Sequence, residues 1–292
     1  MINKEIIDVD QATALHKLQQ EEYEILCAVA RLCAENDVKW ILDSGTALGA
    51  ARHGGFIPWD DDIDISMTRS EFNKFLKIAE EQLPSEYELN TFDNTPSFAG
   101  FFAKITKKGT EFVNNESLAS EYKQGIFIDI LVHDTLSPLD GERRKQLLNA
   151  SRWQKMSYLY HSSFINVPHK GLLGKVESFG CLLTHYALRA IIRNRDVLKY
   201  HFSKSIIDET PAVSGDVIKN LSYDSDASLP YEMVYPATSI KFMDSLFPAA
   251  RNIDNYLTEM YGNWQDLPAP DARHTHLPVR LVFSDGTTWA KP

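Results

Sequence analysis

The sequence predicts a mixed α/β (α+β) fold in which a mixed sheet carries most of the core. Apolar residues recur at helical spacing near the N-terminus and then form short β-patterned runs separated by turns and further helical segments. At 292 residues the chain is long enough to bury a large core together with helical additions. It contains no internal repeat or low-complexity tract, so a repeat architecture is excluded.

The first predicted elements are a long helix, a strand and a short helix. Apolar spacing predicts an amphipathic helix over 12–36, and the apolar run 38–42 predicts a buried strand. Gly45 and Thr46 follow this strand in a glycine turn. A helix over about 47–53 would then offer free backbone N–H groups to a phosphate.

The next predicted elements are one helix and three strands. Thr68 and Glu71 form a capping-box pattern at the start of a helix over 69–82. Runs of β-branched and aromatic residues predict three strands, at 86–92, 101–106 and 126–131. This irregular alternation of helices and strands favours a mixed sheet over a purely parallel one.

Closely spaced carboxylates follow the short helix in the segment 56–66, which reads FIPWDDDIDIS. On a strand, Asp62 and Asp64 would point to one face, while Ile63 and Ile65 would point into the core. Like charges this close are unfavourable unless a cation lies between them, and carboxylate oxygens favour Mg2+ or Mn2+. The spacing therefore predicts a divalent-metal site of the kind used in phosphotransfer.

Two other interpretations of the acidic run stay open. One is a solvated loop without function. The other is a calcium loop in which Asp60, Asp62 and Asp64 take positions one, three and five and Glu71 takes position twelve. That loop requires glycine at position six, where this chain has Ile65, and the preceding glycines and proline leave no entering helix.

Gly45-Thr46 and the segment 56–64 together resemble the signature of the LicD family, to which fukutin and fukutin-related protein are distantly similar. The resemblance implies a polymerase β-type nucleotidyltransferase core with helical additions. It implies Asp129 as a third carboxylate, so that Asp62, Asp64 and Asp129 are the expected catalytic and metal-binding residues. A charge in an apolar strand must be paired or bound to metal, so a buried salt bridge between Asp129 and Lys104 stays open as the alternative.

The family acts on cell-surface glycans, so the resemblance implies transfer of phosphocholine from CDP-choline to a hydroxyl of a teichoic acid, lipopolysaccharide or capsule precursor. Other donors stay open, namely CDP-ribitol, CDP-glycerol or a sugar nucleotide. A nucleotidyltransferase that releases pyrophosphate from a nucleoside triphosphate is a further alternative, and a non-catalytic scaffold in a glycan assembly complex is another. The acceptor is expected to be a glycan or glycolipid.

Several further residues match family positions and are expected to bind substrate. They are Gly45, Thr46, Arg52, His53, Trp59, Lys104, Arg273 and His276. Lys104 and the arginines suit phosphates, whereas Trp59 and Phe56 are candidates to receive the quaternary ammonium of choline on an aromatic face. For each of these residues a structural role in packing, capping or hydrogen bonding stays open.

The resemblance is weakest over about 140–230, which suggests three parts. We expect a catalytic core over 1–135, a mainly helical insertion over 136–230 that meets the acceptor or a membrane, and a C-terminal module over 231–292 that packs back on the core.

The net charge of −10 argues against a general nucleic-acid binder, which needs a basic surface. The N-terminus is acidic and lacks an apolar signal region, and the three cysteines have no disulfide-framework or metal-finger spacing. These features predict a cytoplasmic location, with contact to the inner face of the cell membrane as an extension of it.

One segment, 170–204, reverses the charge balance with seven basic and two acidic residues, which leaves −15 on the rest of the chain. Within it, 176–192 is largely apolar but too short and too polar to span a membrane. We expect a buried helix of an accessory layer there. The alternative is an interfacial helix whose basic end approaches anionic lipid.

Overall fold

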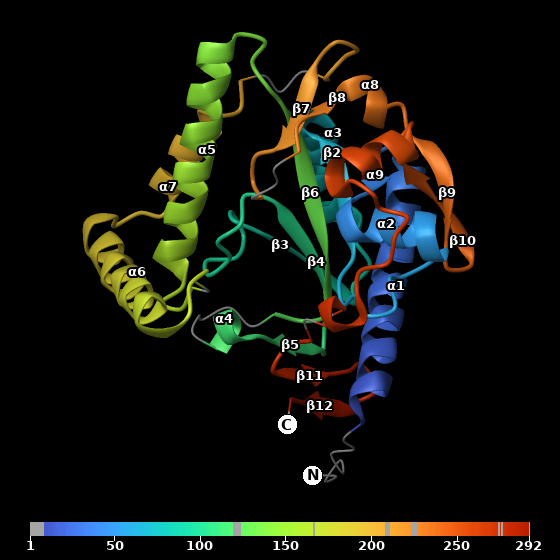
Figure 1. Ribbon diagram of the computed structural model, residues 1–292, viewed down its shortest axis with the longest axis horizontal. Helices are drawn as coiled ribbons and strands as arrows, with labels where there is room; N and C mark the ends of the chain where they lie inside the picture. Colours follow the sequence, from blue (N-terminus) through green and yellow to red (C-terminus); the bar gives the residue numbers. More distant parts are fainter. Residues whose placement is uncertain are drawn as a thin grey trace.

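The computed structural model describes residues 9–118, 124–165, 167–207, 211–223, 227–273, 275 and 277–291. It confirms the mixed α/β class, because these residues form a seven-stranded mixed sheet surrounded by helices and two smaller sheets (Figure 1). The predicted substrate-binding residue His276 lies outside the described residues.

Strand β6 (Phe127–Thr135) is the centre of the main sheet. It runs parallel to β2 (Asp64–Thr68) on one side. On its other side the first half pairs antiparallel with β4 (Ala103–Lys107), and the last residues pair with β7 (Val217–Asn220). The outer strands are β1 (Ile41–Leu42), β3 (Tyr87–Thr91) and β8 (Leu229–Pro230). Because β2 and β6 are parallel and in register, their first residues lie at the same end of the sheet.

Strand β2 begins at Asp64, two residues later than predicted, but the predicted alternation holds. Ile63 and Ile65 are fully buried, whereas Asp62 is exposed and Asp64 is partly exposed. The backbone N–H of Asp64 donates to the Thr46 hydroxyl at 2.8 Å, so the start of the strand is fixed by the helix before it.

Helices α1 (Gln11–Glu35) and α3 (Arg69–Gln82) pack on the sheet, close to their predicted bounds. The capping box predicted for α3 is wrong, because the Thr68 side chain makes no cap hydrogen bond. The Glu71 carboxylate instead accepts the backbone N–H of Lys39 at 2.9 Å. A donor from a distant segment therefore replaces the local partner that the pattern suggested.

Three helices form a separate layer beside the sheet (Figure 1). They are α5 (Asp140–His161), α6 (Gly171–Ile191) and α7 (Asp196–Ser203). Apolar side chains of α5 and α7 pack with Phe92, Phe101 and Leu136 in a second core cluster. The expectation that 176–192 is a buried helix is wrong, because Gly174 is the one buried residue of α6. Among the described residues, no helix has the length and hydropathy needed to cross a bilayer.

The C-terminal segment returns to the first half of the chain. Its elements are α8 (Tyr231–Val234), β9 (Thr238–Phe242), β10 (Ser245–Ala249), α9 (Ile253–Tyr261), the 3-10 turn Pro270–Ala272, β11 (Arg280–Val282) and β12 (Thr288–Ala290). Strand β11 pairs with β5 (Glu111–Val113), which precedes the short helix α4 (Asn115–Leu118). Strands β7 and β8 belong to the main sheet, and the division into three parts stays a prediction.

Candidate active site

Asp64 and Asp129 are register partners on the parallel strands β2 and β6. Neighbouring strands lie about 4.8 Å apart, and paired residues point to the same face of a sheet. Lys104 of β4 is in turn the register partner of Asp129. A row of two carboxylates and one ammonium group therefore crosses three strands, with Asp62 in the exposed segment just before Asp64.

The carboxylates of this row repel one another. Burial raises the pKa of Asp64 well above its usual range, and the charges of Asp62, Asp129 and Asp43 raise it further, while Lys104 lowers it. Burial also raises the pKa of Asp129, although Lys104 Nζ lies 2.7 Å from its Oδ1. The salt bridge that the sequence left open for Asp129 is thus present. A divalent cation would relieve the remaining repulsion.

The donor set suits a hard cation, but the side chains are not arranged around one. Throughout the described residues, no group of three or more His, Cys, Asp or Glu side chains is placed so that it could hold a metal ion. Asp129 is instead directed to Lys104. Carboxylate oxygens are nevertheless the ligands that Mg2+ and Mn2+ prefer. The metal therefore stays a prediction that rests on ligand chemistry and repulsion.

Two buried carboxylates of this region were not predicted. Glu22 of α1 is fully buried, and neither of its carboxylate oxygens has a hydrogen-bond partner among the described residues. Burial raises its pKa, and the charges of Asp62, Asp61 and further acids raise it more. The sequence carries one signal for it, because Glu22 stands on the apolar face of the helix between Leu18 and Ile25. The second buried carboxylate that was not predicted is that of Asp43.

Asp43 joins the sheet to α2 (Ser44–His53) and α9. Its carboxylate accepts the backbone N–H of Ser44 at 2.7 Å and the hydroxyls of Ser66 and Tyr256. Ser44 has the left-handed φ of 48°, which is uncommon outside glycine and is held here by two hydrogen bonds to its N–H. The predicted short helix thus begins three residues earlier than expected, and Gly45 and Thr46 form its first turn.

Gly45 and Thr46, which the sequence predicts to bind substrate, also make close contacts within the protein. A Cβ added at Gly45 would lie 2.9 Å from Asp60 Oδ2, so the turn and the acidic segment approach each other closely. The Thr46 hydroxyl accepts a hydrogen bond from the backbone N–H of Asp64. The glycine turn therefore positions the carboxylate segment directly.

Four predicted donor-binding residues lie together around Trp59. The Arg273 guanidinium lies 5.3 Å from the Trp59 ring centroid, and the His53 ring meets Trp59 edge-on at 6.3 Å. Burial and the nearby charge of Arg273 lower the pKa of Arg52. Arg52 Nη1 donates to the carbonyl oxygens of Trp264 and Asp266 at 2.9 and 3.2 Å. One cationic cluster is thus formed by the predicted residues Arg52, His53, Trp59 and Arg273.

Phe56, the other aromatic candidate for choline, packs instead on Phe242, with ring centroids 5.0 Å apart.

A cavity of about 200 Å³ contains Lys104 and Asp129. The rings of Phe98, Phe102, Phe127, Tyr158 and Tyr223 contribute to its lining. Lys104 Nζ lies 3.4 Å from the centroid of the Phe127 ring, so this ring already accepts a cation on its face.

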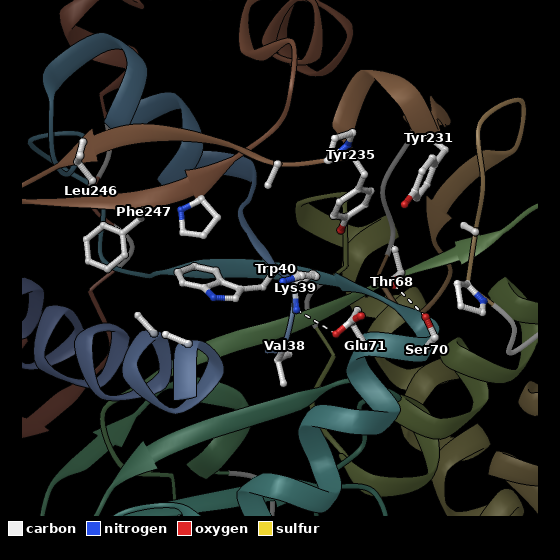
Figure 2. Close-up of a pocket in the computed structure, with 17 residues that line it drawn as sticks. Val38, Lys39, Trp40, Thr68, Ser70, Glu71, Tyr231, Tyr235, Leu246 and Phe247 are labelled. Carbon is white, nitrogen blue, oxygen red and sulfur yellow. Dashed lines mark hydrogen bonds between the residues drawn. The ribbon is translucent and has the colours of Figure 1, made fainter. Parts of the chain in front are cut away.

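A larger cavity, of about 580 Å³, lies elsewhere (Figure 2). Trp40, Tyr231, Tyr235 and Phe247 line it, and a dashed line in Figure 2 marks the hydrogen bond from the Lys39 backbone to Glu71 in its lining. Its lining includes Thr68 at the far end of β2 but none of the predicted site residues that the structure describes. Of these two cavities, the smaller one is the candidate for substrate, because it contains Lys104 and Asp129.

Comparisons with known proteins indicate the family to which part of the chain belongs. Residues 37–163 match the family described as LicD/FKTN/FKRP, nucleotidyltransferase domain. The chain is also 24% identical, over 90% of its length, to the lipopolysaccharide cholinephosphotransferase LicD of Haemophilus influenzae, 97% of which is covered. The chain carries a LicD-family domain. This confirms the predicted family.

The LicD-family domain contains most of the candidate site. It extends from just before β1 to just after α5 and so includes Asp62, Asp64, Lys104 and Asp129. Arg273 lies beyond it.

Two uncharacterised Rickettsia proteins are also similar to the chain. The one from Rickettsia prowazekii is 24% identical over 61% of this chain and 69% of its own length, and the one from Rickettsia typhi is 36% identical over 25% of this chain and 21% of its own.

Proposed function

We propose that this protein transfers phosphocholine from CDP-choline to a hydroxyl of a lipopolysaccharide or related cell-surface glycan, with Mg2+ or Mn2+ as cofactor. The observation that carries the proposal is the register pairing of Asp64 with Asp129, beside Lys104, inside a LicD-family domain. The similarity to the Haemophilus influenzae cholinephosphotransferase supports the choice of donor and acceptor class.

Different residues of the chain would bind the metal ion and the donor phosphates. Asp62, Asp64 and Asp129 would hold the divalent ion, which when bound supplies positive charge to the donor diphosphate. Lys104 adjoins them and suits a phosphate oxygen as a point charge. The cationic cluster around Trp59 brings Arg52 and Arg273 together, and closely spaced guanidinium groups suit a diphosphate.

The transfer forms one bond and breaks one. The acceptor oxygen attacks the phosphorus that bears choline, the phosphoanhydride bond breaks, and CMP leaves with the electron pair. The acceptor hydroxyl loses its proton, for which the Asp129 carboxylate, in the cavity beside Lys104, is the candidate base. The reaction is in line, so the residues must hold the attacking and leaving oxygens on opposite sides of phosphorus.

The cavity beside Asp129 is the better candidate for the choline head group. Aromatic faces attract quaternary ammonium ions, and Phe127 already has the Lys104 ammonium 3.4 Å from its centroid. The Trp59 ring is less available, because the Arg273 guanidinium lies over it. We therefore assign the head group to the rings of Phe102 and Phe127, with Lys104 shifting toward the phosphate.

Release of CMP from CDP-choline tests the function. The purified protein is incubated with Mg2+ or Mn2+ and a glycolipid extract. Release should need both the metal and the extract, and Asp62→Ala, Asp64→Ala and Asp129→Ala should each lower it more than about a hundredfold. Asp285→Ala, which removes an exposed carboxylate on the β11–β12 turn, is the matched control and should keep full activity.

The other donors are distinguishable in the same assay. Turnover of CDP-ribitol, CDP-glycerol or a sugar nucleotide, with none of CDP-choline, would overturn the donor but keep the site. Pyrophosphate released from a nucleoside triphosphate would indicate a nucleotidyltransferase instead. Normal activity in any one of the three aspartate variants would refute the role assigned to that residue.

A further inference from the structure

An apolar stripe runs along the outer face of α6. Its residues follow one another at intervals of four, three, four and three, which places them on one side of a helix. They are Leu172, Val176, Phe179, Leu183 and Tyr186, and between 55% and 81% of each is exposed. Soluble surfaces rarely expose a contiguous row of large apolar side chains unless it binds something. In Figure 1, α6 lies at the margin of the molecule, away from the sheet.

The opposite face of α6 is fixed to the protein. Gly174 is buried against the backbone of His169, where a side chain would not fit. His185 Nδ1 lies 2.8 Å from the Leu159 carbonyl oxygen, and the Arg189 guanidinium lies 5.3 Å from the Tyr160 ring centroid. These contacts with α5 and the preceding loop set the rotation of the helix. Because of these contacts the apolar stripe points away from the rest of the protein, and no element among the described residues covers it.

Basic residues flank the apolar stripe. Lys175 is exposed and lies about 60° around the helix axis from the centre of the stripe, and Arg193 is exposed two residues after the end of α6. Glu177, the acidic residue of α6, is turned toward His169, with Nδ1 and Oε1 2.7 Å apart. The surface thus combines apolar side chains with positive charge, and it lies in the segment 170–204, outside which the chain carries −15.

We propose that α6 docks the protein on an anionic lipid bilayer and lies in the plane of the interface. The apolar stripe would enter the boundary between headgroups and acyl chains, while Lys175 and Arg193 contact lipid phosphates. The charge decides between this occupant and a second copy of the chain, because a symmetric dimer through α6 would bring the same basic residues face to face. The inference goes beyond the proposed function and does not depend on the donor, although it would place a lipid-linked acceptor within reach.

Sedimentation of the full chain with vesicles, without nucleotide or acceptor, tests the proposal. Binding to vesicles of phosphatidylcholine with phosphatidylglycerol should exceed binding to phosphatidylcholine alone and should weaken with salt. Phe179→Glu with Leu183→Glu should abolish it, and Lys175→Glu with Arg193→Glu should weaken it about tenfold or more. The matched control is Leu246→Glu on β10, where leucine is 73% exposed but lies away from α6, and it should bind as the wild type does.

Two results would overturn the proposal. One is wild-type binding that is absent, or that persists unchanged in the Phe179→Glu, Leu183→Glu variant. The other is a dimer in light scattering that this variant converts to a monomer, which would assign the apolar stripe to a second copy. Because the substituted side chains are exposed and outside the active site, CMP release with a water-soluble acceptor fragment should be retained. Failure of the donor assignment would thus be seen separately from failure of membrane docking.

Discussion

His161, at the end of α5, is buried beside the cavity that contains Lys104 and Asp129. Burial lowers its pKa from 6.5 to about 4, against a hydrogen bond to the Ser157 carbonyl that raises it. The unfolded chain therefore binds a proton that the folded chain does not between about pH 6.5 and 4. The free energy of unfolding should fall as the pH falls through this window, by up to about 3 kcal/mol from this group.

Urea unfolding at pH 4.5 and pH 7 measures this contribution. In His161→Gln the difference between the two pH values should be smaller than in the wild type by about 2 kcal/mol. His16→Gln, at an exposed histidine of α1, should keep the wild-type difference. An unchanged difference in His161→Gln would show that this histidine does not carry the acid sensitivity.

At the scale of single residues, the sequence could predict side chains whose roles depend on near neighbours. The alternation of Asp62 and Asp64 with buried isoleucines is of this kind. Asp43 could not be predicted in this way, because its partners Ser66 and Tyr256 are 23 and 213 residues away. Lys104 shows a mixed case, since its partner Asp129 was foreseen but its contact with the Phe127 ring was not.

Helix α2 approaches the following turn so closely that Gly49 has no room for a side chain. A Cβ there would lie 2.5 Å from the Gly55 carbonyl oxygen. Gly49→Ala should therefore lower the free energy of unfolding by about 1–3 kcal/mol, measured in urea. Because α2 carries Thr46, which holds Asp64, CMP release should fall as well.

The matched control is Gly180→Ala on α6, where nothing lies within 4 Å of an added Cβ. Alanine is the better helix former, so this variant should be as stable as the wild type or more stable by up to about 1 kcal/mol. Equal stability of Gly49→Ala and the wild type would mean that α2 and the turn can separate without cost.

At the scale of elements, periodicity predicted where helices and strands lie but not what covers them. The bounds of α3 are as predicted, because its apolar spacing is encoded locally, although its predicted cap is not formed. The predicted burial of α6 is wrong because what covers a helix is not encoded in its own sequence. Its apolar residues could have met protein or another phase. The contact of Gly174 with the preceding loop and that of His185 with α5 decide which face points outward.

Across the whole molecule, a buried and a partly exposed carboxylate have opposite electrostatic surroundings. Asp134 is paired with Arg69 through two hydrogen bonds, at 2.7 and 2.9 Å. Asp64 lies among Asp62, Asp129 and other acids, which raise its pKa together with burial. Removing one negative charge should therefore have opposite effects on stability at the two positions, although both variants are Asp to Asn.

Thermal unfolding with EDTA and with Mg2+ compares these two variants. With EDTA, Asp64→Asn should melt about 2–4 °C above the wild type because repulsion is relieved. Asp134→Asn should lose about 3–5 kcal/mol, since it leaves the Arg69 charge buried without a partner. Mg2+ at a hundredfold excess over its Kd should stabilise the wild type by about 2.7 kcal/mol and Asp134→Asn by a similar amount, but not Asp64→Asn. If Mg2+ stabilises Asp64→Asn as much as the wild type, then Asp64 is not a ligand and the row of carboxylates across β2 and β6 is not the metal site.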